Sequence, residues 1–225
     1  MSRDSEIAKK FIEEEFSESM KQSLVDFEAN NRDELIDYVI KNKAWNDTII
    51  YERMKKESQI LKKRDDVCEA LIKEIRKLNN SSRFQLWHKS TLERLAKDFF
   101  EANYGMAQKF LNMSIKYIYF LELAYGITLI DKLSFGVFKE DFDVPIDSFI
   151  LKWLIYNSVE DQEFFERAEE ITSWNKMKNS IYPFVQKKAK ELFKERYREC
   201  GSVLIAETLV WSGIKRLKSK IHMEL

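Results

Sequence analysis

Helix-breaking residues are almost absent from this chain. Its 225 residues include only 5 Gly and 2 Pro, while 44% are hydrophobic and 34% are charged. Glycine and proline cost most in the interior of a helix, and the apolar residues recur at helical spacing nearly throughout. The sequence therefore predicts an all-α fold, a compact multi-helix domain of roughly nine to eleven helices.

One polar linker, Asn79-Asn80-Ser81-Ser82, divides the chain into two parts. Residues 1–80 are predicted to form an N-terminal helical layer. It has one amphipathic helix over Phe11 to Phe27 and a long, sparsely apolar helix from about Asp47 to Leu78. Residues 81–225 are predicted to form a helical core that holds a helical hairpin and the candidate active-site region.

One predicted helix, Met106 to Tyr125, is apolar around most of its circumference, which indicates a buried helix at the centre of the fold. Gly105 is predicted to end the preceding helix and to start this one, so that the two form a hairpin. Lys109, Asn112 and Lys116 lie on one face of it. Because burial disfavours the charged form of a lysine, we expect this polar stripe to be paired or to line a cavity.

The only long irregular segment predicted covers residues 126–146, between two apolar helices. Loops of this length tend to be functional. Pro145 disfavours helix at the residue before it, and Asp147 is well suited to cap a helix that begins at Ser148. Asp147 therefore also has a purely structural explanation.

Two short runs resemble the active-site region of the helix-hairpin-helix DNA glycosylases, in particular the 8-oxoguanine branch. They are Gly105 to Lys109, which opens an apolar helix, and the aliphatic-Pro-aliphatic-Asp run Val144 to Asp147. The resemblance covers about residues 90–156. Ala107 stands where the family has a second hairpin glycine, and the interval to the aspartate is longer than in most of the family, closer to its archaeal branch.

The resemblance implies a DNA glycosylase with AP-lyase activity. Lys109 would attack C1′ of the damaged nucleotide and form a Schiff base with the ring-opened sugar, and Asp147 would assist. The target base must leave the stack to be reached, and aromatic rings could line a pocket for it. Lys116 is a rival for the role of nucleophile. The predicted substrate-binding residues are Gly105, Asn112, Lys116, Phe142 and Trp153.

Other chemistries have little basis in the sequence. His88 and His222 stand in no metal-ligand spacing, and Cys68 and Cys200 have no partner spacing. No glycine-rich phosphate loop or nucleophile elbow is present. We therefore expect no metal and no cofactor. Without a recognisable secretory signal or a membrane-length apolar run, the sequence predicts a cytoplasmic protein that does not bind membranes.

Charge is distributed unevenly along the chain. Residues 1–40 hold 5 Lys and Arg against 11 Asp and Glu, whereas residues 176–225 hold 12 against 5. The simpler interpretation is either that the acidic first helix packs near the basic last helices or that each charged face is simply solvated. The other is a basic C-terminal surface that binds DNA by neutralising its phosphates. Its residues would be Lys187, Lys188, Lys190, Lys194, Arg196, Arg198, Lys215, Arg216, Lys218 and Lys220.

A second class of function stays open, a non-catalytic α-helical interaction protein in which Lys109 is merely structural. Such a protein could self-associate through the helix predicted over residues 47–78 or through Val203 to Ile214. Salt dependence separates the two classes, because phosphate contacts weaken as salt rises.

Overall fold

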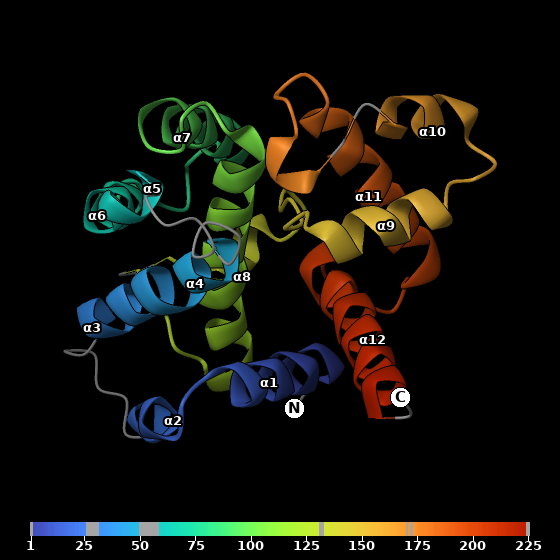
Figure 1. Cartoon of the computed structure of the whole chain (residues 1–225). Helices are drawn as coiled ribbons and strands as arrows, with labels where there is room; N and C mark the ends of the chain where they lie inside the picture. The colour runs from blue at the N-terminus through green and yellow to red at the C-terminus, as the bar shows by residue number, and fades with distance from the viewer. Residues whose placement is uncertain are drawn as a thin grey trace.

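The structure is a computed structural model that describes residues 2–25, 32–49, 59–130, 133–169, 171 and 173–223. Within these ranges the fold is all-α: nine α-helices of at least seven residues, several shorter helices and no strand. Figure 1 shows one long helix, α8 (Tyr104–Tyr125), in the middle of the molecule with the other helices around it. The predicted fold class is confirmed.

Helix α8 is the central core helix that its sequence predicts, because all its residues from Tyr104 to Leu121 are buried. The Asn103 side chain caps its start by accepting a hydrogen bond from the Met106 amide. Gly126 ends it in the left-handed conformation, at φ 69°.

The predicted hairpin is formed by α7 (Phe84–Asp98) and α8, which pack against each other. Its turn differs from the prediction, because Gly105 lies inside the first turn of α8. The left-handed positions are instead Glu101 and Ala102, with φ 54° and 61°. A Cβ at Gly105 would collide with the carbonyl oxygen of Trp174, so the glycine serves close packing at this position.

The N-terminal layer has shorter helices than its sequence pattern predicts. The first amphipathic helix is broken at Phe16 and Ser17 into α1 (Arg3–Glu15) and α2 (Glu18–Val25). The prediction of a single helix over residues 47–78 is wrong. A π-helical turn, η2, leads into α4, which ends at Thr48, and Lys63 lies in a turn between α5 and α6. The elements are α1 (Arg3–Glu15), α2 (Glu18–Val25), α3 (Arg32–Asp37), η2 (Tyr38–Ala44), α4 (Trp45–Thr48), α5 (Gln59–Lys62) and α6 (Arg64–Ile75). Phe27 and residues 50–58 lie outside the described residues.

The N-terminal layer and the rest of the chain share one hydrophobic core. Buried residues from both sides of the predicted linker belong to a single cluster, and α1 packs along α8. Helix α1 also packs against α12 (Val203–Met223), where the Lys215 amine lies 3.2 Å from the Glu15 carboxylate. This contact is the arrangement expected from attraction between an acidic first helix and a basic last helix.

The C-terminal half forms a group of helices beside α8 (Figure 1). The described residues that follow α8, 126–130 and 133–147, are irregular apart from a short 3-10 helix and an isolated bridge between Ile130 and Leu133. The elements are η4 (Phe135–Phe138), α9 (Ser148–Tyr156), α10 (Gln162–Glu169), η5 (Trp174–Lys176), α11 (Tyr182–Arg196) and α12 (Val203–Met223). Among the described residues, no helix has the length and apolar character needed to cross a membrane.

Candidate active site

The structure brings Lys109 and Asp147 together. The Lys109 amine lies 3.6 Å from a carboxylate oxygen of Asp147, and the two side chains are only 11% and 13% exposed. Asp147 caps α9 as its sequence predicts, with its other oxygen accepting hydrogen bonds from the amides of Phe149 and Ile150. One carboxylate therefore fixes the start of a helix and also faces the amine of a lysine on α8.

Both residues line a cavity of about 610 Å³ enclosed by α1, α4, α8, α9, η5 and α12. Its polar walls are mixed in charge. The Asp, Glu and Lys residues that line it are Glu15, Asp47, Lys109, Lys116, Asp147, Lys152 and Glu207. Its aromatic walls are Phe11, Tyr117, Phe149, Trp174 and Trp211. A cavity of this size, apolar over much of its lining and with a few converging polar groups, is typical of a small-molecule site.

Aromatic packing orients the Lys109 amine. Its nitrogen lies 4.8 Å from the centre of the Trp174 ring, within the range of a cation–π interaction. Trp174 is 3% exposed and belongs to η5, the short helix that Gly105 allows to approach α8. Because Gly105 leaves room for η5 beside α8, it allows Trp174 to form an aromatic wall of the cavity.

Lys116, the rival nucleophile, is engaged in a buried ion pair. Its amine lies 2.5 Å from a Glu207 carboxylate oxygen, and both side chains are at most 3% exposed. Burial raises the pKa of Glu207, and the neighbouring Lys116 opposes that rise. Because Lys116 is held by this partner and by the Phe11 ring 4.5 Å away, Lys109 is the better-placed amine for a ligand in the cavity.

Asp47 is a second carboxyl group in the cavity wall. It lies in α4, and its Oδ2 atom accepts a hydrogen bond of 2.7 Å from the Tyr117 hydroxyl. Burial raises the pKa of Asp47, although the hydrogen bond from Tyr117 lowers it. Burial also holds the pKa of Tyr117 well above its usual value, so this hydroxyl remains a donor at neutral pH.

The other predicted substrate-binding residues lie outside this cavity. Asn112 points away from Lys109, into a buried hydrogen-bond network with His88 and Tyr182. Phe142 is fully buried in the core, where it contacts the Tyr119 ring edge to face. Trp153 stacks on Phe193 with ring centres 4.9 Å apart. Gly105 is covered by the backbone of Trp174 and Asn175.

Several cavity residues were missed by reasoning from the sequence. These residues come from three segments that are far apart in the chain: Asp47 from α4, Trp174 from η5, and Glu207 and Trp211 from α12. No local pattern marks them, because each lies at an ordinary helical position and reaches the cavity only through tertiary packing. Tyr117, by contrast, directly follows Lys116 on α8 and lies about two helical turns from Lys109.

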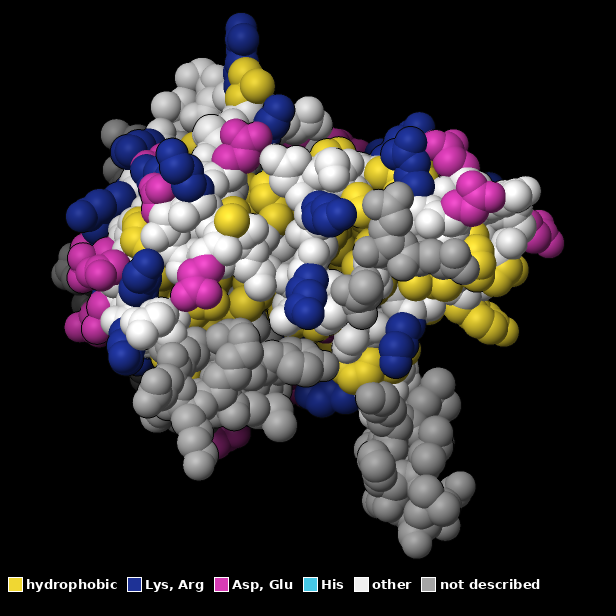
Figure 2. All heavy atoms as spheres, turned by 45° about the horizontal axis from the view of Figure 1, so that its top comes forward, with side chains coloured by type: hydrophobic (Ala, Val, Ile, Leu, Met, Phe, Trp, Pro, Cys, Tyr) yellow, Lys and Arg dark blue, Asp and Glu magenta, His cyan; other side chains and the backbone are white. Residues whose placement is uncertain are grey.

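The basic C-terminal residues are largely paired with carboxylates. Lys188 and Lys190 lie 2.5 Å and 2.7 Å from Asp161 and Asp143. Figure 2 shows Lys and Arg side chains spread over the face in view and interspersed with Asp and Glu. Three further basic residues of the predicted surface also form ion pairs: Lys187, Lys194 and Lys215. The side chains of Lys218 and Lys220 lie outside the described residues.

The stretch from Val203 to Ile214, proposed for self-association, begins α12. Its first residues, up to Ala206, are buried, and the helix packs against α1, α9 and α11 of the same chain. Much of its apolar face is therefore already covered within one molecule.

The chain has no significant match among protein-family models, curated proteins or solved structures. The geometry of Lys109 and Asp147 and the predicted resemblance around them are therefore the basis of the proposal that follows.

Proposed function

We propose that this protein is a DNA glycosylase with AP-lyase activity, in which Lys109 is the nucleophile. The observation that carries the proposal is the 3.6 Å approach of the Lys109 amine to the Asp147 carboxylate at the wall of an aromatic-lined cavity. An amine nucleophile needs a neighbouring group that accepts its proton, and Asp147 is in position to do so.

The reaction follows from this geometry. The Lys109 amine forms a bond to C1′ of the target nucleotide while the bond from C1′ to the base breaks and the base departs with the electron pair. One amine proton passes by way of Asp147 to the departing base, and the other passes to the O4′ oxygen of the sugar as the ring opens, which leaves a neutral Schiff base between Lys109 and C1′. The aromatic walls, Trp174 and Trp211 among them, offer stacking surfaces for a base taken out of the helix.

Borohydride trapping tests the proposal. Borohydride reduces a Schiff base to a stable amine, so we expect the wild-type protein to form a covalent complex with duplex DNA that contains one abasic site. The variant Lys109→Gln should form none. Lys152→Gln is the matched control, because Lys152 lines the same cavity but is exposed on α9. A Lys109→Gln protein that still traps DNA would refute the assignment.

A further inference from the structure

The backbone just before Asp147 is held by side-chain amides instead of by a neighbouring strand. Gln108 on α8 donates to the Ile146 carbonyl oxygen at 2.7 Å and accepts from the Ile146 amide at 3.1 Å. Gln186 on α11 makes the same pair of bonds to Val144, at 2.7 Å and 2.9 Å. Residues 144–146 are therefore held by side-chain hydrogen bonds from two helices, α8 and α11.

Burial makes these contacts costly to lose. Gln108 is fully buried and Gln186 is 3% exposed, and a buried amide without partners would destabilise the fold. An apolar side chain of similar size would leave the amide and carbonyl groups of Ile146 or Val144 buried without these partners. Each glutamine therefore fixes the position of one backbone residue in this segment.

Gln108 ties together the two residues of the candidate active site. It directly precedes Lys109 in α8, and its partner Ile146 directly precedes Asp147. Asp147 is thus fixed in two ways: its side chain caps α9, and the Ile146 carbonyl of the preceding peptide group accepts a hydrogen bond from Gln108. Small rotations of that peptide group would move the carboxylate away from the Lys109 amine.

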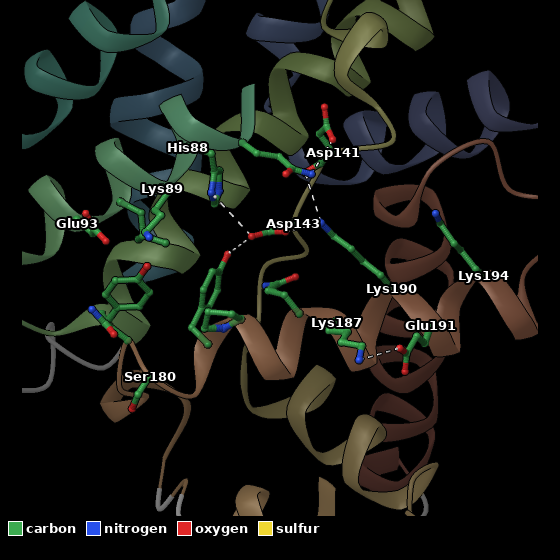
Figure 3. A pocket seen from close by; sticks show the side chains of 17 residues that line it. His88, Lys89, Glu93, Asp141, Asp143, Ser180, Lys187, Lys190, Glu191 and Lys194 are labelled. Carbon is green, nitrogen blue, oxygen red and sulfur yellow. Dashed lines mark hydrogen bonds and ion pairs between the residues drawn. The ribbon is translucent and has the colours of Figure 1, made fainter. Parts of the chain in front are cut away.

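The other end of the segment is anchored at the wall of a second cavity, of about 800 Å³. The Tyr182 hydroxyl donates to Asp143 at 2.7 Å, and the Lys190 amine lies 2.7 Å from the other oxygen of that carboxylate. Figure 3 shows His88, Asp143 and Lys190 converging on this wall. His88 also contacts Asn112, which donates to the Val144 carbonyl oxygen. These groups satisfy one another and hold Asp143 and Val144 in place.

We propose that Gln108 is a positioning residue that holds the Asp147 carboxylate against Lys109, whereas Gln186 supports only the more distant Val144. The catalytic part of this inference rests on the proposed function, but the structural part does not. Loss of the two bonds from Gln108 releases Asp147, and loss of the two bonds from Gln186 does not.

The matched variants Gln108→Met and Gln186→Met test this difference. Each removes two buried hydrogen bonds to one backbone residue, and Gln108→Met also removes a longer 3.3 Å contact from Asn112. We expect both to lower Tm by similar amounts. In single-turnover borohydride trapping on abasic-site duplex DNA, Gln108→Met should react at least tenfold more slowly with an unchanged DNA Kd. Gln186→Met should stay within threefold of wild type.

Hydrogen exchange measured by NMR gives a readout that needs no activity. The amides of Phe149 and Ile150 are protected by the Asp147 cap, so their exchange should speed up at least tenfold in Gln108→Met and stay near wild type in Gln186→Met. Gln108→Leu, which also removes both bonds to Ile146, replaces Gln108→Met if that variant does not fold.

The outcomes separate the two claims. If wild type traps no DNA, the proposed function fails, and exchange at Phe149 and Ile150 still decides whether Gln108 positions Asp147. If wild type traps DNA but the two variants slow trapping equally, or neither slows it, the positioning role of Gln108 is refuted. Equal exchange in the two variants refutes it as well.

Discussion

Asp147 makes two kinds of contact in this structure, the helix cap and the approach to Lys109, and two substitutions separate their effects. Asn keeps an oxygen that can accept hydrogen bonds from the amides of Phe149 and Ile150. Asp147→Asn therefore retains the helix cap, whereas Asp147→Ala removes it. Both variants lose the negative charge that faces the Lys109 amine at 3.6 Å. Any difference in stability between the two variants therefore reports the cap, and the effect that they share reports the charge.

The magnitudes follow from these contacts. Loss of a helix cap costs about 1 kcal/mol, so Asp147→Ala should unfold about 2–4 °C below Asp147→Asn for a chain of this size. Loss of an acid–base partner typically slows a reaction by about 100-fold or more, equivalent to about 2.7 kcal/mol in the barrier. We expect both variants to trap abasic DNA at least this much more slowly than wild type.

Calorimetry and single-turnover borohydride trapping measure the two effects. Asp161→Asn is the matched control, because Asp161 also caps a helix, by accepting from the Phe164 amide, but lies outside the cavity. This control should trap DNA at the wild-type rate. The reasoning is refuted if Asp147→Asn reacts as fast as wild type, or if Asp147→Ala and Asp147→Asn have the same Tm.

Three further predictions concern stability. Burial raises the pKa of Asp47 above 3.8, which means that the folded state is penalised when Asp47 is charged at neutral pH, so Asp47→Asn should raise Tm at pH 7. This gain in Tm should shrink as the pH falls through the raised pKa of Asp47, and thermal melts from pH 4 to 8 would measure it. Lys116→Met leaves the Glu207 carboxylate buried without its cation and should lower the free energy of unfolding in urea by about 3–5 kcal/mol. The double variant Lys116→Met/Glu207→Leu should recover most of that loss, and no recovery would contradict this prediction. Gly105→Ala should lower Tm because its Cβ would collide with the backbone, whereas Gly213→Ala on α12, where no atom lies within 4 Å of the new Cβ, should stabilise the protein by about 0.5–1 kcal/mol. Equal shifts of Tm in the two variants would contradict the close-packing role of Gly105.

Local sequence signals predicted the fold class and two parts of the candidate site. The apolar circumference of the central helix predicted α8, and the order Pro145, Ile146, Asp147 predicted the cap of α9. Both features depend on residues within a few positions of one another, so the sequence alone contains the physical reason for them.

Tertiary contacts decided what the sequence did not predict. The approach of Asp147 to Lys109 depends on how the irregular segment folds back, and buried amides such as Gln108 hold it there. Amphipathic spacing over residues 47–78 is continuous enough to suggest one helix, yet α4 ends at Thr48 and Lys63 lies in a turn. The spacing of apolar residues indicates which face of a helix is apolar, but it does not indicate where tertiary packing interrupts the helix.

The central claim is that Lys109 forms a covalent bond to the sugar of damaged DNA, and peptide mapping of the borohydride-reduced complex tests it most directly. Mass spectrometry of the digested complex should place the added nucleotide mass on the peptide that contains Lys109, and fragmentation should place it on that side chain. An adduct found on Lys116, on Lys152 or at several lysines without preference would contradict the assignment.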